Sequence, residues 1–164
     1  MSIIFSENKY PIAGNISWDD VIEKISKESS DMIILWKEFE IQSAKTDANN
    51  EKLACFSGSS NLPTFFLIKD YYPGTIGETF QEVNKDCGVK VMHTYVSFGD
   101  YSMTFGNHND DLNVLLVQAK GSTSYICDEN NYTLNPGDSL FIPKGFNHNP
   151  VITGPRVTLS FSWE

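Results

Sequence analysis

Positive charge is scarce in this sequence: 12 Lys and Arg residues stand against 21 Asp and Glu residues, for a formal net charge of −9. A surface of that sign repels phosphate backbones, so direct binding of nucleic acid is not expected. Long apolar runs are also lacking, and no stretch approaches the roughly 20 apolar residues of a membrane helix. We therefore expect no membrane span.

Cysteine is equally scarce. Cys55, Cys87 and Cys127 are an odd number at wide spacings, which predicts three free thiols rather than a disulfide framework or a metal knuckle. The amino-terminal segment, MSIIFSENKY, lacks the basic and apolar stretches of a secretory signal. A cytoplasmic location is therefore expected.

The bulk composition fits one folded unit. Its 164 residues are 40% hydrophobic and 20% charged, as is typical of globular domains. The character of the sequence changes near residue 88. We predict a single domain over residues 1–164, with an N-terminal α+β flank over 1–88 and a β-rich core over 89–164.

Helix and strand signals alternate in the flank. Ser17 with Asp20 has the spacing of a capping box before a helical apolar pattern, and Thr75 with Glu78 repeats it, with Gly88 as the stop. The remaining assignments are strands over residues 32–39 and 65–71 and a loop over about 42–61.

From residue 89 the pattern is that of an all-β sandwich or barrel, with short strands between Gly, Asn, Asp and Pro. In the last strand, Val157, Leu159 and Phe161 alternate with polar residues. If its polar face points inward, it would suit a ligand-holding barrel; if outward, it is merely solvated. The predicted strands are 89–98, 101–107, 112–119, 122–127, 131–134, 138–142 and 156–163.

Two of the three histidines stand in a pattern that suggests metal binding. His108 and Asp110 are two residues apart, so an extended backbone directs both side chains to one side. His148 follows forty residues later. Two imidazoles and one carboxylate can occupy three adjacent corners of an octahedron, the ligand set of non-haem iron(II) oxygenases. Manganese, nickel or zinc would accept the same ligands.

The segment PGDSLFIPKGFNH surrounds His148 with turn residues. Gly137, Pro143, Gly145 and His148 have the spacing G-x5-P-x-G-x2-H. Gly137 can close a turn before a strand, and Pro143 can end that strand because proline lacks a backbone donor. Gly145 allows a tight bend that returns His148 toward the barrel mouth.

That spacing resembles the second cupin motif, and residues 91–163 resemble the JmjC-like cupins of the ribosomal-oxygenase and asparaginyl-hydroxylase types. The resemblance implies a mainly β fold, a double-stranded β-helix (cupin or jelly-roll) barrel with an N-terminal α+β extension. It also implies an Fe(II)/2-oxoglutarate-dependent dioxygenase, with His108, Asp110 and His148 as metal-binding and catalytic residues. Iron is then the cofactor and 2-oxoglutarate the co-substrate.

The resemblance also suggests residues for the co-substrate. Thr123 stands where the family usually has a Lys or Arg that pairs with the distal carboxylate, so a charge-assisted contact of roughly 1.5–3 kcal/mol is lost at this position. Lys120 is expected to be solvated, and His93 to be a packed or surface residue. The candidate cofactor-binding residues are Asn113, Thr123, Tyr95, Thr104, Tyr125 and Ser162.

Three functions remain open at this stage. The first is an Fe(II)/2-oxoglutarate-dependent hydroxylase. The second is a metal-dependent cupin enzyme that does not use 2-oxoglutarate, which the threonine at position 123 favours. The third is a non-catalytic cupin that binds a small ligand or a partner. The substrate can be a small molecule or a protein, and both a monomer and a homodimer are compatible with the sequence.

Overall fold

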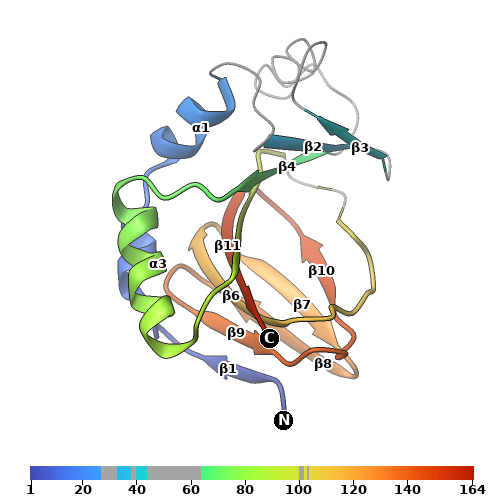
Figure 1. Cartoon of the computed structure of the whole chain (residues 1–164). Coiled ribbons are helices and arrows are strands. Elements are labelled where there is room, and N and C mark those ends of the chain that lie inside the picture. Colours follow the sequence, from blue (N-terminus) through green and yellow to red (C-terminus); the bar gives the residue numbers. More distant parts are fainter. Residues whose placement is uncertain (27–32, 38–39, 44–63, 100–101, 103) are drawn as a thin grey trace.

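The computed structural model describes residues 1–26, 33–37, 40–43, 64–99, 102 and 104–164. Two antiparallel sheets form its framework (Figure 1). The larger has the order β1 (Ile4–Ser6), β9 (Ser139–Ile142), β6 (Asn113–Lys120), β11 (Arg156–Trp163), β5 (Val91–Ser97), β4 (Thr64–Lys69), β2 (Ile33–Lys37) and β3 (Glu40–Ser43). The smaller has the order β10 (Asn149–Ile152), β7 (Thr123–Cys127) and β8 (Asn130–Leu134).

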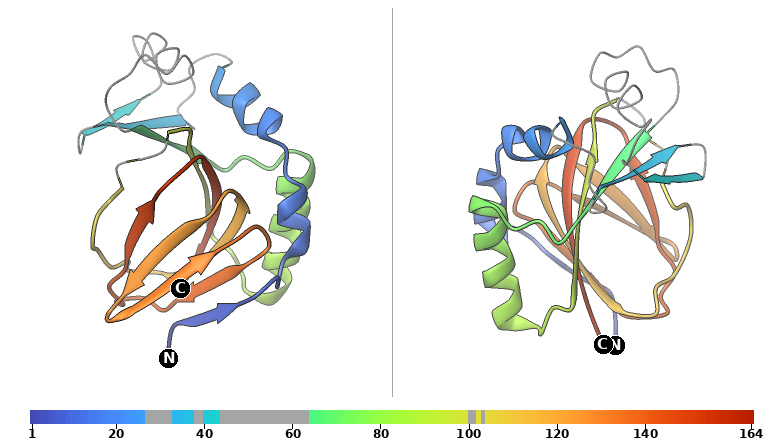
Figure 2. Two further views of the ribbon diagram at one scale, coloured as in Figure 1. Left: turned by 180° about the vertical axis from the view of Figure 1, so that it is seen from behind. Right: turned by 45° about the horizontal axis from the view of Figure 1, so that its top comes forward.

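The two faces of the large sheet are covered differently. Figure 2 shows the helices η1 (Pro11–Asn15), α1 (Trp18–Ser26) and α3 (Gly74–Asp86) on one side of the sheet and the three-stranded sheet on the other. The N-terminal flank and the β-rich core share the large sheet, because β4 of the flank pairs with β5 of the core. None of the described helices is long and apolar enough to cross a membrane.

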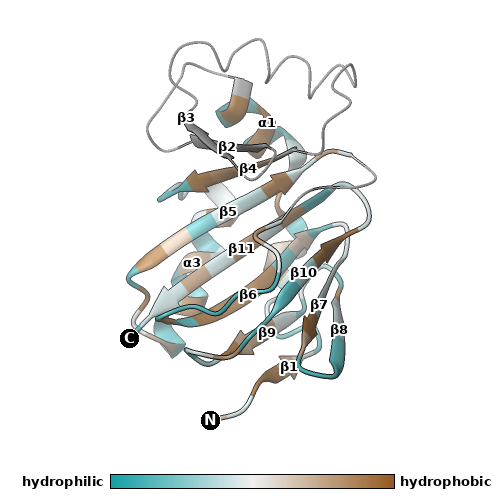
Figure 3. Ribbon diagram, turned by 90° about the vertical axis from the view of Figure 1, so that its right-hand side faces the viewer, coloured by the Kyte–Doolittle hydropathy of each residue, from teal (hydrophilic) through white to brown (hydrophobic). Residues whose placement is uncertain are grey.

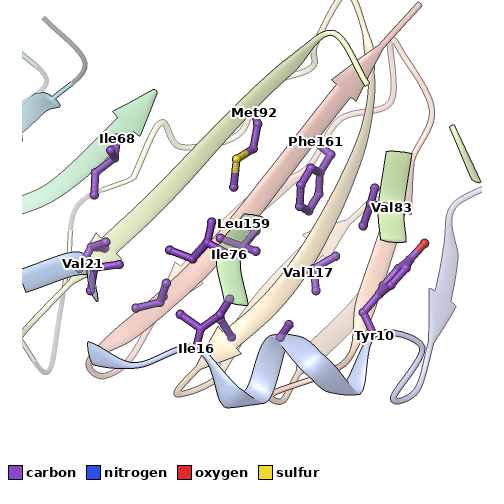
Figure 4. Close-up of a cluster of buried hydrophobic side chains, with 14 of the residues drawn as sticks. Tyr10, Ile16, Val21, Ile68, Ile76, Val83, Met92, Val117, Leu159 and Phe161 are labelled. Carbon is purple, nitrogen blue, oxygen red and sulfur yellow. The ribbon is translucent and has the colours of Figure 1, made fainter. Parts of the chain in front are cut away.

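A large apolar core fills the space between the large sheet and the helices (Figure 4). Ile16, Val21 and Ile76 come from the helical side, and Leu159 and Phe161 come from β11; all five are fully buried. Burial of such side chains contributes about 1.5–3 kcal/mol each, so this core anchors the helices to the sheet.

A second apolar cluster lies between the two sheets. In β6, Val114 and Leu116 belong to this inner cluster, whereas Leu115 and Val117 belong to the helix-side core. This alternation is the period of two of a strand buried on both faces. Figure 3 shows a different alternation along β11, between hydrophobic and more polar residues.

The polar face of β11 points into the barrel. The sequence alone had left open whether this face points inward or toward solvent. Val157, Leu159 and Phe161 pack on the helix side. The side chains of Arg156, Ser160 and Ser162 line a cavity inside the barrel instead. The sequence prediction of a mainly β architecture with an N-terminal α+β flank is confirmed.

Some predicted details are wrong. No described residue between 104 and 107 is in a strand, so the predicted strand 101–107 is absent there. Ser17 does cap α1, since its Oγ accepts the Asp19 N–H at 3.1 Å, but α3 begins at Gly74 without a side-chain cap from Thr75. β1, η1, β3 and β10 were not predicted, and residues 42–43 of the predicted loop belong to β3. Cys55 and most of the predicted loop 42–61 lie outside the described residues.

Candidate active site

A short antiparallel bridge brings the three predicted metal ligands together. His108 and Asp110 lie in the segment before β6, and His148 lies directly before β10. The backbone N–H of His108 donates to the His148 carbonyl at 3.0 Å, and the reverse bond is 2.8 Å long. The N–H of Gly145 donates to the Asp110 carbonyl at 2.9 Å. The bend at Gly145 thus returns His148 to the segment that carries the other two ligands.

The ligand atoms of the three side chains converge. Asp110 places Oδ2 at 3.5 Å from Nε2 of His148 and Oδ1 at 4.0 Å from Nε2 of His108. The two imidazole centroids are 4.3 Å apart. One ligand atom from each of the three residues lies within 4.8 Å of the others, a spacing that suits a single metal ion.

Backbone contacts prepare both imidazoles for metal binding. Nδ1 of His108 lies 2.8 Å from the carbonyl oxygen of Gly106, and Nδ1 of His148 lies 3.1 Å from that of Phe146. A proton on each Nδ1 satisfies these carbonyls and leaves both Nε2 atoms free as ligands. Burial lowers the pKa of His148, which keeps its imidazole in the neutral form that metals bind.

The three residues lie in the wall of a cavity of about 610 Å³. Aromatic and aliphatic side chains form much of its wall, and a few polar groups interrupt them. An apolar lining strengthens the polar interactions that are made inside it. The lining residues are Phe65, Leu67, Val91, His93, Tyr95, Thr104, Phe105, His108, Asp110, Asp111, Leu112, Val114, Leu116, Tyr125, His148, Pro150, Arg156, Ser160 and Ser162.

Four of the six candidate cofactor-binding residues line this cavity, namely Tyr95, Thr104, Tyr125 and Ser162. Burial raises the pKa of both tyrosines, so their hydroxyls stay neutral. The Arg156 guanidinium acts in the opposite direction on the pKa of both tyrosines. The Oγ1 of Thr104 accepts the Gly106 N–H at 3.0 Å.

The other two candidates, Asn113 and Thr123, are not among the lining residues. Asn113 is 7% exposed, and its Oδ1 accepts the Lys144 N–H at 3.2 Å, which is a contact to the loop after β9. Thr123 is 1% exposed, and its Oγ1 has no hydrogen-bond partner among the described residues. A buried hydroxyl without a partner is unusual in folded proteins.

The sequence reasoning missed two residues in the cavity wall. Arg156, at the start of β11, is 4% exposed and lines the cavity. A signal for it was present, because it is the only arginine of the chain and begins the polar face of the last strand. His93 also lines the cavity and is half-buried. Lys120, expected to be solvated, instead donates from Nζ to the Gly14 carbonyl at 2.7 Å.

Comparisons with known proteins define the class of fold first. No family model matches the sequence, and no curated protein does. Solved structures do match, and they identify the barrel as a cupin-type jelly roll.

Several of the similar structures are of YcfD from Escherichia coli. An X-ray structure of YcfD has a TM-score of 0.75 at 13% identity and covers 99% of this chain and 49% of that one. A structure described as the ribosomal oxygenase YcfD has a TM-score of 0.72 at 13% identity. The match covers 99% of this chain and 48% of that one. A complex of YcfD with cobalt and 2-oxoglutarate has a TM-score of 0.71 at 14% identity, with the same coverage of both chains. The present chain thus spans about half the length of YcfD, and the likeness shows the fold.

Proposed function

We propose that this protein is a metal-dependent oxygenase that uses iron(II) and 2-oxoglutarate to hydroxylate a substrate. The observation that carries the proposal is the convergence of His108, Asp110 and His148 in the wall of one cavity. The similar fold of YcfD, which has been solved with cobalt and 2-oxoglutarate, supports it.

The donor set fits the metal. Two neutral imidazole nitrogens and one carboxylate oxygen leave further positions of an octahedron open, as non-haem iron oxygenases require. Iron(II) held there would supply the oxygen chemistry of C–H hydroxylation. In the overall reaction one atom of O2 enters the substrate as a hydroxyl and the other enters succinate, with release of CO2.

The chain itself contributes position and exclusion of water. The bonds from the two Nδ1 atoms to backbone carbonyls fix the rings, so little reorientation is needed when a metal binds. The rings of Phe65 and Phe105 both line the cavity and contact each other edge to face, with their centroids 5.4 Å apart. An apolar wall of this kind protects reactive species from water.

Metal binding can be tested with cobalt(II), whose absorption spectrum reports its ligands. The wild-type protein should bind one equivalent. His148→Ala and Asp110→Asn should each weaken binding by at least ~100-fold, since each removes one ligand. Glu129→Gln, the same carboxylate-to-amide change at an exposed turn, is the matched control and should bind as the wild type does.

Turnover is then tested with iron(II), 2-oxoglutarate and O2 by following succinate. Slow, metal-dependent succinate formation is expected even without the natural substrate, and Asp110→Asn should abolish it. Cobalt binding without any binding of 2-oxoglutarate would instead indicate a metal enzyme that does not use this co-substrate. Failure to bind cobalt would remove the proposal altogether.

A further inference from the structure

Arg156 is the only arginine of the chain, and it is buried in the cavity wall. It is 4% exposed, at the first residue of β11. Charged side chains are almost never fully buried unless they are paired, because removing a charge from water costs several kcal/mol. The position of this residue therefore requires an explanation.

The contacts of Arg156 do not neutralise it. Its Nε donates to Ser97 Oγ at 3.2 Å. The guanidinium carbon lies 5.4 Å from the ring centroid of Tyr95 and 5.9 Å from that of Phe65. Among the described residues no carboxylate pairs with it. Tyr95 and Tyr125 carry no charge, because burial raises the pKa of each.

Within the described part of the chain, these contacts use Nε and the flat faces of the Arg156 guanidinium but not its two Nη groups. Stacking on aromatic rings uses the flat faces of a guanidinium, and the Ser97 bond uses Nε. The two Nη groups have no hydrogen bond to any residue that the structure describes. A planar fork of free N–H donors in a low-dielectric wall is complementary to a carboxylate.

The position of Arg156 also bears on Thr123, where the sequence lacks the expected cation. A Cβ placed on Gly121 would lie 2.0 Å from the Pro155 carbonyl oxygen and 3.3 Å from the Arg156 Cα. The turn that leads to Thr123 therefore packs directly against the backbone of Arg156. The start of β7 carries Thr123 and no cation, whereas the start of β11, at the same end of the barrel, carries the cation Arg156.

We propose that Arg156 is the anion subsite of the cavity and binds the distal carboxylate of a small dicarboxylic 2-oxo acid. Naming the acid as 2-oxoglutarate rests on the proposed function, whereas the anion subsite rests on Arg156 itself.

The unmutated protein allows a direct test, because one arginine gives one set of guanidinium signals. Protein labelled with ¹⁵N-arginine and loaded with zinc, a diamagnetic metal, is titrated with 2-oxoglutarate and with 2-oxopentanoate. The two acids have the same chain length, but 2-oxopentanoate lacks the distal carboxylate. 2-Oxoglutarate should shift the Arg156 Nη signals, and 2-oxopentanoate should leave them unchanged.

Affinities give the second readout. In Arg156→Gln the Kd for 2-oxoglutarate should rise by at least ~10-fold, as expected for loss of a charge-assisted bidentate contact, and the Kd for 2-oxopentanoate should change by less than about 2-fold. Lys90→Gln removes a cation from the exposed ion pair with Glu164 and is the matched control, with no change expected.

The outcomes separate this inference from the proposed function. If the wild type binds 2-oxoglutarate without a shift of the Arg156 signals, the subsite is wrong and the co-substrate stands. If 2-oxoglutarate does not bind but succinate shifts the signals, the subsite stands and the co-substrate falls. If no dicarboxylic acid shifts them, the subsite is overturned.

Discussion

The imidazole of His93 is half-buried, and it lines the cavity. Burial lowers its pKa, and the nearby Lys69 lowers it further, while Asp70 and Asp110 act in the opposite direction. A histidine with a depressed folded-state pKa stays neutral where the unfolded chain takes up a proton. Its contribution to stability is therefore present above pH ~6.5 and is lost as the pH falls below that value.

We accordingly expect the free energy of unfolding of the metal-free protein to decrease between pH 7.5 and pH 5.5. The pKa of His148 is lowered as well, so His93→Gln should reduce this pH dependence without abolishing it. Urea denaturation at the two pH values, in the presence of a chelator, measures the effect. A variant with the same pH dependence as the wild type would contradict this role of His93.

The ligand residues illustrate what local sequence can predict. The spacing of His108, Asp110 and the turn residues before His148 was readable because each residue has a local mechanical role. Arg156 was not identified, because its importance depends on which face of β11 points inward. That direction follows from packing against the helices and has no local cause.

The turn at Gly121 joins β6 to β7, and β7 contributes Tyr125 to the cavity wall. Gly121 has a φ of +64°, and a Cβ there would lie 2.0 Å from the Pro155 carbonyl oxygen. Gly121→Ala should therefore destabilise the protein by about 2–4 kcal/mol, through both backbone strain and a clash. Gly154→Ala is the control, since nothing lies within 4 Å of its Cβ position and its φ is not positive. Chemical denaturation compares the two, and equal stabilities would refute the argument.

The segment before the candidate metal ligands shows where strand prediction failed. Residues 101–107 have the composition of a strand, yet none of the described residues among them is in one. Instead the Thr104 hydroxyl accepts the Gly106 N–H, and the Gly106 carbonyl faces Nδ1 of His108. These local polar contacts compete with strand pairing and at the same time orient a ligand. Over the described residues, a loop that orients a candidate metal ligand takes the place of the predicted strand.

Ligand binding should stabilise the whole molecule, because an unfolded chain cannot assemble ligands from residues forty positions apart. A metal or co-substrate at 100 times its dissociation constant stabilises by about 2.7 kcal/mol. For a domain of this length that corresponds to a Tm increase of roughly 5–10 °C. Differential scanning calorimetry with manganese(II), and then with added 2-oxoglutarate, should show two successive increases. His148→Ala should show neither.

The class of fold, most strand positions and the three residues of the candidate metal centre could be predicted from the sequence. This was possible because hydrophobic alternation and turn chemistry are local, and both are encoded within a few residues. Tertiary structure alone decided that the polar face of β11 lines the cavity and that the chain's only arginine lies within it. Those outcomes depend on which sheet face the helices cover, and that choice is made by contacts between segments far apart in the chain.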